Sequence, residues 1–305
     1  MNGGIIDAHT HMFPVEVMSC YDRYACKDTC FKQLTEITPQ SRVIEVFCTP
    51  EQAIEAMDRA GVQKIVMQGW YWMDMGLCRE HNDYMHEVVS RFPDRFAAYA
   101  SINPTMGGEA IAEFLRIQKM NFLGVGELGP GGNKFALDHP TLWELLEGCE
   151  SCGLPVNFHV GEPVGHEYPG KDLTPIDGFY RIALRFPKLK LILAHIGGGM
   201  PYFELWPKVR EALRNAYYDL AAAPLLYHID CVAAAVRLAG AHRVLFGTDF
   251  PLTIYPRITK GLEIGLFAKD IRERAGLSED EFALVMRANM LGLLKGAEEA
   301  KQARA

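Results

Sequence analysis

Ile5-Ile6-Asp7-Ala8-His9-Thr10-His11 has the composition of a short buried β-strand that ends in two histidines. Side chains alternate between the two faces of a strand, so His9 and His11 point the same way, with Asp7 one layer beneath them. Two imidazoles on one face can share a divalent metal ion, and a nearby carboxylate can fix the tautomer of a ligating ring. The alternative is a pair of polar residues that merely ends a strand. Further ligands at the ends of other strands would decide between the two interpretations.

The composition excludes several classes of partner. The chain has 305 residues, of which 49% are hydrophobic, enough for one large core or two modest ones. Its 31 basic and 38 acidic residues give a formal charge of −7, which argues against binding of nucleic acid. No segment has the apolar length of a membrane span, and Met1-Asn2-Gly3-Gly4 leads into the first strand without a signal peptide. We therefore expect a soluble, cytoplasmic protein with no membrane partner.

The eight cysteines are expected to be reduced. Cys149 and Cys152 form a C-x-x-C, but no second C-x-x-C completes a zinc knuckle. Disulfides are rare in proteins without a secretion signal. We expect thiols with a structural role.

Strand-like and helix-like segments alternate along most of the chain. Thr49-Pro50-Glu51 is typical of a helix start, and Gly61 ends that helix. Helices are predicted over residues 50–60, 82–92, 109–119, 141–152, 175–186, after 201, over 226–239 and twice near the C-terminus. Strands are predicted over residues 5–11, 62–68, 96–102, 122–127, 154–159, 189–195, 216–220 and 243–249.

Eight such units imply a parallel sheet and suit a closed (β/α)8 TIM barrel, an α/β fold. We expect one domain over residues 1–305, with a long loop insertion at about 12–50 that could form a lid or a substrate wall. Arg23 and Arg42 lie in this insertion and could clamp an anionic substrate. The alternative is an open doubly wound sheet, which would usually carry a glycine-rich loop where this chain has its first histidines.

Polar side chains follow the apolar runs of five predicted strands. The active site of a (β/α)8 barrel is built at the carboxyl ends of its strands, so these side chains should converge on one rim. They are His9 and His11 after the first strand, Glu127 after the fourth, His159 after the fifth, His195 after the sixth and Asp249 after the eighth.

These motifs resemble the amidohydrolase superfamily. Besides Asp7-Ala8-His9-Thr10-His11 and His159, the resemblance rests on His195-Ile196-Gly197-Gly198-Gly199-Met200-Pro201 and on Leu245-Phe246-Gly247-Thr248-Asp249-Phe250-Pro251. It is strongest with the amidohydrolase-related (amidohydrolase 2) branch, which includes aminocarboxymuconate-semialdehyde decarboxylase, and it spans nearly the whole chain. The resemblance implies that His9, His11, His159 and Asp249 bind the metal. It also implies that His195 is the catalytic base.

The chemistry of these residue types agrees with such an assignment. Three neutral imidazoles and a carboxylate leave an open metal position for water, whose pKa a divalent ion can lower to about 7. His195 can move the proton, and Asp249 can serve as ligand and proton acceptor in turn. We expect a divalent metal, most readily Zn²⁺, with Mn²⁺ or Fe²⁺ as alternatives.

Glu127 has three open interpretations. It could be a further metal ligand, it could contact the substrate or a residue that binds the metal, or it could form a structural salt bridge. Trp70 and Trp72, directly after the second strand, and Glu162, in a loop near the rim, are predicted to contact the substrate. The expected partner is a small molecule, and a homodimer is compatible with the sequence.

Two reactions fit the predicted site. The leading prediction is hydrolysis of a small-molecule ester, lactone or amide by metal-activated water. The alternative is non-oxidative decarboxylation of an unsaturated or aromatic acid on the same scaffold. Gly197-Gly198-Gly199-Met200-Pro201 favours the carboxy-lyase, whereas Glu127 favours the hydrolase. A metal-free barrel that only binds ligands is the third possibility, and the six convergent side chains argue against it.

Overall fold

The computed structural model describes residues 4–35, 47–166, 171, 173–253 and 261–304. Its strands are short, run parallel and follow one another in space in chain order. They are β1 (Ile5–Thr10), β2 (Val62–Gln68), β3 (Phe96–Tyr99), β4 (Val125–Leu128), β5 (Val156–Phe158), β6 (Leu191–Leu193), β7 (Ala216–Asp219) and β8 (Val244–Leu245).

Two seams join the three-stranded and five-stranded sheets into a closed barrel. A parallel bridge pairs Ala100 with Val125 between β3 and β4, and a second pairs Thr10 with Phe250 between β8 and β1. The amide of Ala8 also donates to the Phe246 carbonyl oxygen at 2.8 Å. The predicted (β/α)8 barrel is thereby confirmed.

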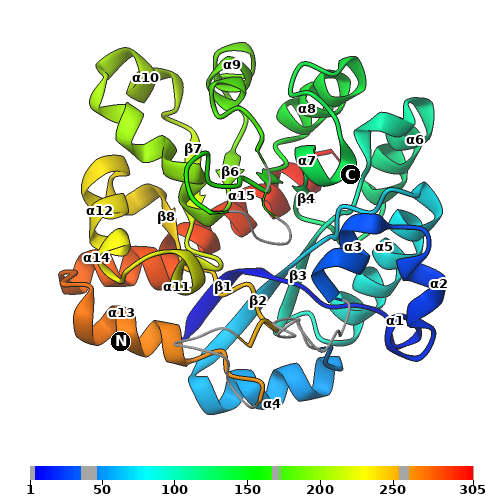
Figure 1. Ribbon diagram of the computed structural model, residues 1–305, viewed down its shortest axis with the longest axis horizontal. Helices are drawn as coiled ribbons and strands as arrows, with labels where there is room; N and C mark the ends of the chain where they lie inside the picture. The colour runs from blue at the N-terminus through cyan, green and yellow to red at the C-terminus, as the bar shows by residue number, and fades with distance from the viewer. Residues whose placement is uncertain (1–3, 36–46, 167–170, 172, 254–260, 305) are drawn as a thin grey trace.

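Helices surround the strands, as Figure 1 shows. Those between strands are α4 (Pro50–Ala60), α5 (Met75–Arg91), α6 (Gly108–Ile117), α8 (Pro140–Cys152), α9 (Asp177–Arg185), α10 (Pro207–Ala212) and α12 (Asp230–Ala239). After β8 come α13 (Leu266–Arg274), α14 (Glu279–Ala283), a π-helical turn η4 (Leu284–Ala288) and α15 (Asn289–Gln302). The segments between the strands also contain η1 (Pro104–Met106), α7 (Pro130–Asn133), η2 (His195–Leu205), α11 (Ala223–Leu226) and η3 (Ala241–Arg243).

Local signals place α4 where the sequence predicts it. Thr49 Oγ1 accepts from the Gln52 amide, and the Gln52 side chain accepts from the Thr49 amide, which is a complete capping box. Gly61 ends the helix with a left-handed φ of 68°.

The core has an inner and an outer part. Side chains such as Ile6, Val66, Ile192 and Leu245 fill the barrel, and Leu293 of α15 packs with them at its amino-terminal end. The larger cluster lies between the strands and the surrounding helices. The carboxyl ends of the strands are thus left for polar residues.

Several predicted boundaries are wrong. Helix α5 begins at Met75, seven residues before the predicted 82, because the Asp74 side chain accepts from the Leu77 amide and caps it there. Strand β8 ends at Leu245, well short of the predicted 249. Part of the predicted loop insertion is helical, since α1 (Val15–Ser19), α2 (Tyr21–Ala25) and α3 (Thr29–Thr35) lie within it.

Two further findings bear on the composition. None of the described helices is long and apolar enough to cross a membrane. The eight cysteines are free thiols, and Cys149 of the C-x-x-C is fully buried against the core. Their reduced state in the cell stays a prediction.

Candidate active site and metal centre

Three of the predicted ligands meet at the ends of β1 and β8. His9 Nε2 lies 3.2 Å from His11 Nε2, and Asp249 Oδ1 lies 3.2 Å from His11 Nε2 and 3.7 Å from His9 Nε2. One ligand atom from each of the three lies within 4.8 Å of the others. The three side chains can therefore hold one ion.

The other three rim residues form a second group. Glu127 Oε1 lies 3.0 Å from His159 Nδ1 and 3.5 Å from His195 Nε2, and the two histidine nitrogens are 3.1 Å apart. These atoms also satisfy the geometry of a shared cation. The prediction grouped His159 with His9 and His11, whereas its Nδ1 here faces Glu127 and His195.

Glu127 links the two groups. Its other oxygen, Oε2, lies 3.7 Å from His9 Nε2 and 3.6 Å from His11 Nε2. Burial opposes ionisation of this carboxyl, but the neighbouring His159 and His9 outweigh it and hold the pKa of Glu127 well below its usual range. The Glu127 carboxylate thus lies between the two groups of imidazoles. The sequence placed it on the same rim as the histidines.

Asp219, at the end of β7, orients two of the histidines and was missed by the sequence analysis. Its Oδ2 lies 2.9 Å from His9 Nδ1, while its Oδ1 accepts from the backbone amides of His195 and Ala221, both at 3.1 Å. The carboxylate is fully buried. The available signal was Tyr217-Tyr218-Asp219, a polar residue at the end of a predicted strand.

The tautomer of His9 explains why a cation fits this site. Because His9 donates its Nδ1 proton to Asp219, the lone pair of the neutral ring lies on Nε2. That nitrogen lies 3.2 Å from His11 Nε2 and 3.7 Å from Asp249 Oδ1, two further atoms of the kinds that bind metal ions. Two imidazole nitrogens and one carboxylate oxygen that converge in this way are a donor set that fits a divalent metal ion.

Asp7 lies beneath this site, as predicted. Its Oδ1 accepts from the amides of His9 and Thr248, both at 3.1 Å, and its Oδ2 accepts from the Thr248 hydroxyl at 2.5 Å. Asp7 therefore fixes the end of β1 against the segment that carries Asp249.

His195 is held by the turn after β6. Its own φ is 56°, and Ile196 to Gly199 continue in the left-handed region. The ring Nδ1 lies 2.9 Å from the Ala221 carbonyl oxygen, which requires a proton on Nδ1. Burial opposes charging of this ring, but Glu127 outweighs it and raises the pKa of His195 to about 9. His195 is thus placed to hold a proton at Nε2.

Aromatic rings from the loop after β2 line the site. The Trp70 ring centroid lies 5.5 Å from that of His11, and the Tyr71 centroid lies 5.6 Å from that of His159. The two rings stack on each other at 4.7 Å. Tyr71, which was not among the predicted substrate contacts, therefore faces the histidines alongside Trp70.

Trp72 lies one layer further back. Its ring is 1% exposed and packs 4.9 Å from Phe31, within a cluster that also contains Phe13. The indole N–H donates to His81 Nδ1 at 3.1 Å, and His81 Nε2 lies 2.7 Å from the Met12 carbonyl oxygen. Trp72 and His81 thus support the loops that carry Trp70 and His11.

The remaining candidates lie elsewhere on the rim or outside it. Glu162 is largely buried and accepts from the Tyr227 hydroxyl at 3.2 Å. Arg23 is exposed and pairs with Glu80 at 3.0 Å, which satisfies its charge outside the histidine groups. Arg42 lies outside the described residues.

Comparison with known proteins identifies relatives for nearly the whole chain. Residues 6–293 match the sequence model of a family described as "Amidohydrolase". The chain is 25% identical over 299 residues to 2-amino-3-carboxymuconate-6-semialdehyde decarboxylase of Dictyostelium discoideum, with 82% of each chain covered.

Solved structures share the fold. That of 5-carboxyvanillate decarboxylase from Sphingomonas paucimobilis superposes with a TM-score of 0.74 at 18% identity, covering 96% of this chain and 99% of the other. A dihydroxybenzoic acid decarboxylase from Polaromonas, solved with manganese and 2-nitroresorcinol, gives a TM-score of 0.67 at 19% identity, with 96% and 97% covered. At this identity the likeness concerns the fold.

Proposed function

Because this chain belongs to the amidohydrolase family, we propose that it is a metal-dependent carboxy-lyase that decarboxylates an unsaturated or aromatic acid without an oxidant. The chain is an enzyme of this superfamily and carries a site for a divalent metal. Decarboxylation was the alternative prediction and is here preferred to hydrolysis. The sequence relative that spans 82% of this chain is a decarboxylase by name, and so are the proteins of the two solved structures.

One observation of the site carries the choice of substrate. Trp70 and Tyr71 present stacked rings beside His11 and His159, at 5.5 and 5.6 Å. Aromatic faces favour a flat, conjugated partner, and the neighbouring cation site favours a carboxylate on it. A planar conjugated acid satisfies both.

Each rim residue has a role in this proposal. His9, His11 and Asp249 would hold the ion, which would supply the positive charge that attracts the oxygens of the acid, while His159 packs against Glu127 and His195. Cleavage of the bond to the carboxyl carbon leaves its electron pair on the substrate carbon, which must then take a proton. His195, whose ring is held by the Ala221 carbonyl oxygen with Nε2 toward the site, is the group placed to deliver that proton. Carbon dioxide and the protonated carbon compound are the products.

A panel assay tests this proposal. Protein loaded with manganese or zinc is incubated with 2,6-dihydroxybenzoate, 5-carboxyvanillate and 2-amino-3-carboxymuconate-6-semialdehyde, and with a set of lactones and esters. We expect release of carbon dioxide from an acid in the panel and no titratable acid from the lactones. Acid release from a lactone without carbon dioxide would contradict the proposal.

Hydrolysis stays as a second candidate because of Glu127. The group of Glu127, His159 and His195 satisfies the geometry of a second cation site, and a second ion would favour activation of water. Metal analysis of Glu127→Gln distinguishes the two: loss of one of two ions favours hydrolysis, and retention of a single ion favours the carboxy-lyase. A homodimer, a cytoplasmic location and a single domain remain predictions.

A further inference from the structure

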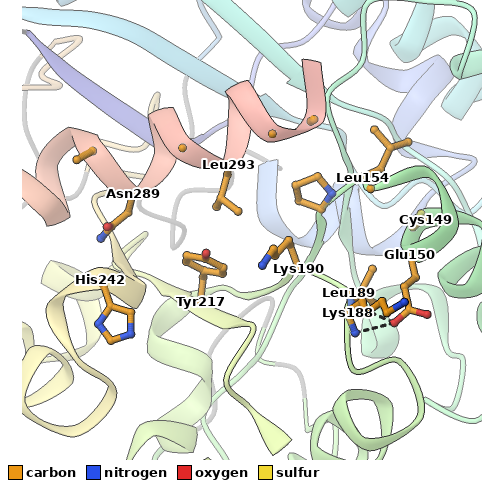
Figure 2. Close-up of a pocket in the computed structure, with 16 residues that line it drawn as sticks. Cys149, Glu150, Leu154, Lys188, Leu189, Lys190, Tyr217, His242, Asn289 and Leu293 are labelled. Atoms are coloured by element: carbon orange, nitrogen blue, oxygen red, sulfur yellow. Dashed lines mark hydrogen bonds between the residues drawn. The ribbon is translucent and has the colours of Figure 1, made fainter. Parts of the chain in front are cut away.

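A cleft of about 550 Å³ lies at the opposite end of the barrel from the histidines. It is bounded by α15 on one side and, on the other, by the residues that begin the last strands of the barrel. Figure 2 shows Leu293 pointing from α15 toward Tyr217, with Lys190 and His242 on either side of that ring. The catalytic histidines lie at the carboxyl ends of the same strands, so this cleft is separate from the candidate active site.

Lys190 gives the cleft an uncompensated positive charge. Its ammonium donates to Asn215 Oδ1 at 2.8 Å, and the Asn215 amide is fixed in turn by donating to the Pro187 carbonyl oxygen at 2.7 Å. No carboxylate among the described residues pairs with Lys190. Burial alone lowers the pKa of this ammonium. An ammonium has three donors, so two remain for a ligand.

The surroundings of Lys190 differ from those of several arginines in the protein. In an acidic chain of net charge −7, described arginines such as Arg95, Arg116 and Arg243 pair with carboxylates. The one acidic side chain of the cleft, Glu150, is engaged by the backbone amides of Lys188 and Leu189 at 2.8 and 3.2 Å. The cleft therefore has a charge that its own residues leave unmatched.

The rest of the lining suits an apolar body. The Tyr217 ring, Leu154 and Leu293 provide apolar surface. Gly292 and Gly296 on α15 add no side chains, and a Cβ built on either would meet nothing within 4 Å. Space next to these glycines is thus open, and the cleft volume is in the range of small-molecule sites, about 300–1,000 Å³.

We propose that this cleft binds a small organic carboxylate with a planar apolar body. Lys190 receives the carboxylate, and the body lies against the Tyr217 ring in the open space beside Gly292 and Gly296. The site is independent of the reaction proposed above, because it shares no residue with the rim. The ligand of this cleft need not be a substrate of the reaction at the rim.

The test uses 4-fluorobenzoate as the probe and follows its binding to the full-length protein by ¹⁹F NMR and calorimetry. Lys190→Met keeps the apolar stem and removes the charge, and we expect it to weaken binding about tenfold or more, because hydrogen bonds to charged groups contribute about 1.5–3 kcal/mol. Gly292→Leu fills the open space and should abolish binding at this site. Leucine also favours a helix over glycine, so the melting temperature should not fall.

Lys295→Met is the matched control, because Lys295 is an exposed lysine of the same helix that does not line the cleft. It should bind the probe as the wild type does. The proposal is overturned if the wild type does not bind 4-fluorobenzoate, or if Lys190→Met and Gly292→Leu bind it with unchanged affinity. It is also overturned if Gly292→Leu changes the sedimentation mass, since the cleft would then belong to a contact between copies of the chain.

Discussion

At the centre of the site, two histidines depend on one carboxylate. Asp219 fixes the ring of His9 through Nδ1 and the backbone of His195 through its amide. A carboxylate behind a ligating imidazole sets its tautomer and raises its basicity. Asp219 therefore supports metal binding through His9 and positions His195 as well.

Replacing Asp219 should weaken metal binding without removing a ligand. In Asp219→Asn the side chain loses its charge and one acceptor, so His9 is no longer held as the Nδ1–H tautomer. We expect the affinity for zinc or manganese to fall about 10–100-fold, measured by competition with a chromophoric chelator. Asp230→Asn, which changes an exposed carboxylate beside His228, is the control. Equal affinities for the two variants would show that Asp219 does not support the ion.

His195 should affect turnover rather than metal content. His195→Asn removes the proton held at Nε2, and general acid–base groups contribute about 10²–10⁴-fold to rate. We expect the variant to keep its metal, measured by plasma emission, and to lose turnover on the acid found by the panel assay. Joint loss of metal and activity would make His195 a ligand.

The sequence could predict the six rim residues because each follows an apolar run at a strand end. It could not predict Tyr71 as the ring that faces His159. Alternation of side chains stops where the strand stops, so the directions of Trp70, Tyr71 and Trp72 depend on packing against α5 and α7. Trp72 turns away because Phe31 and His81 supply a buried apolar place and an acceptor for its N–H.

Among the elements, η2 carries His195 and is anchored at its other end by a buried ion pair. Glu204 accepts from the Tyr218 hydroxyl at 2.6 Å and from Arg243 Nη1 at 2.9 Å, and Arg243 Nη2 also donates to it. Arg243 and Glu204 are almost completely buried. This pair fastens η2 to β7 and to the start of β8.

Breaking the pair should destabilise the whole domain. Glu204→Gln keeps the shape but leaves the Arg243 charge buried without a counter-charge, which costs about 3–5 kcal/mol. We expect the free energy of unfolding in urea to fall by that amount. Glu211→Gln, on the exposed side of α10, should change it by less than about 0.5 kcal/mol. A Glu204→Gln variant as stable as Glu211→Gln would mean that the pair does not anchor η2.

Element boundaries were predicted less well than element types. The apolar segments 189–195 and 243–249 stay buried beyond the ends of β6 and β8. The residues after these two strands lie beneath the histidine groups of the candidate active site. Hydrophobicity therefore continues after the strand has ended. Helices α1 to α3 were missed because helices of five to seven residues are too short to show a helical period.

On the scale of the whole molecule, the barrel closes around the metal site. The site joins β1 to β8 through His9 and Asp249, which lie 240 positions apart in the chain, 249 minus 9. An ion that binds only the folded state stabilises it by mass action. Stability and metal content should thus be linked.

Removing the metal should lower the melting temperature. At a free ion concentration of about 100 times the dissociation constant, the bound ion adds about 2.7 kcal/mol to the free energy of unfolding. We expect chelator-treated protein to melt several degrees lower and to recover when manganese or zinc is restored. The Asp219→Asn variant should show a smaller shift at the same ion concentration. A melting temperature that does not respond to added metal would show that metal binding does not stabilise the folded protein.

Anomalous diffraction from crystals grown with manganese tests the metal centre most directly. We predict a peak between His9 Nε2, His11 Nε2 and Asp249 Oδ1, at about 2.0–2.3 Å from each ligand atom. The same peak should be absent from crystals of a His9→Ala, His11→Ala double variant. A structure with full manganese occupancy elsewhere, or with none at these three residues, would contradict the assignment of His9, His11 and Asp249 as metal ligands.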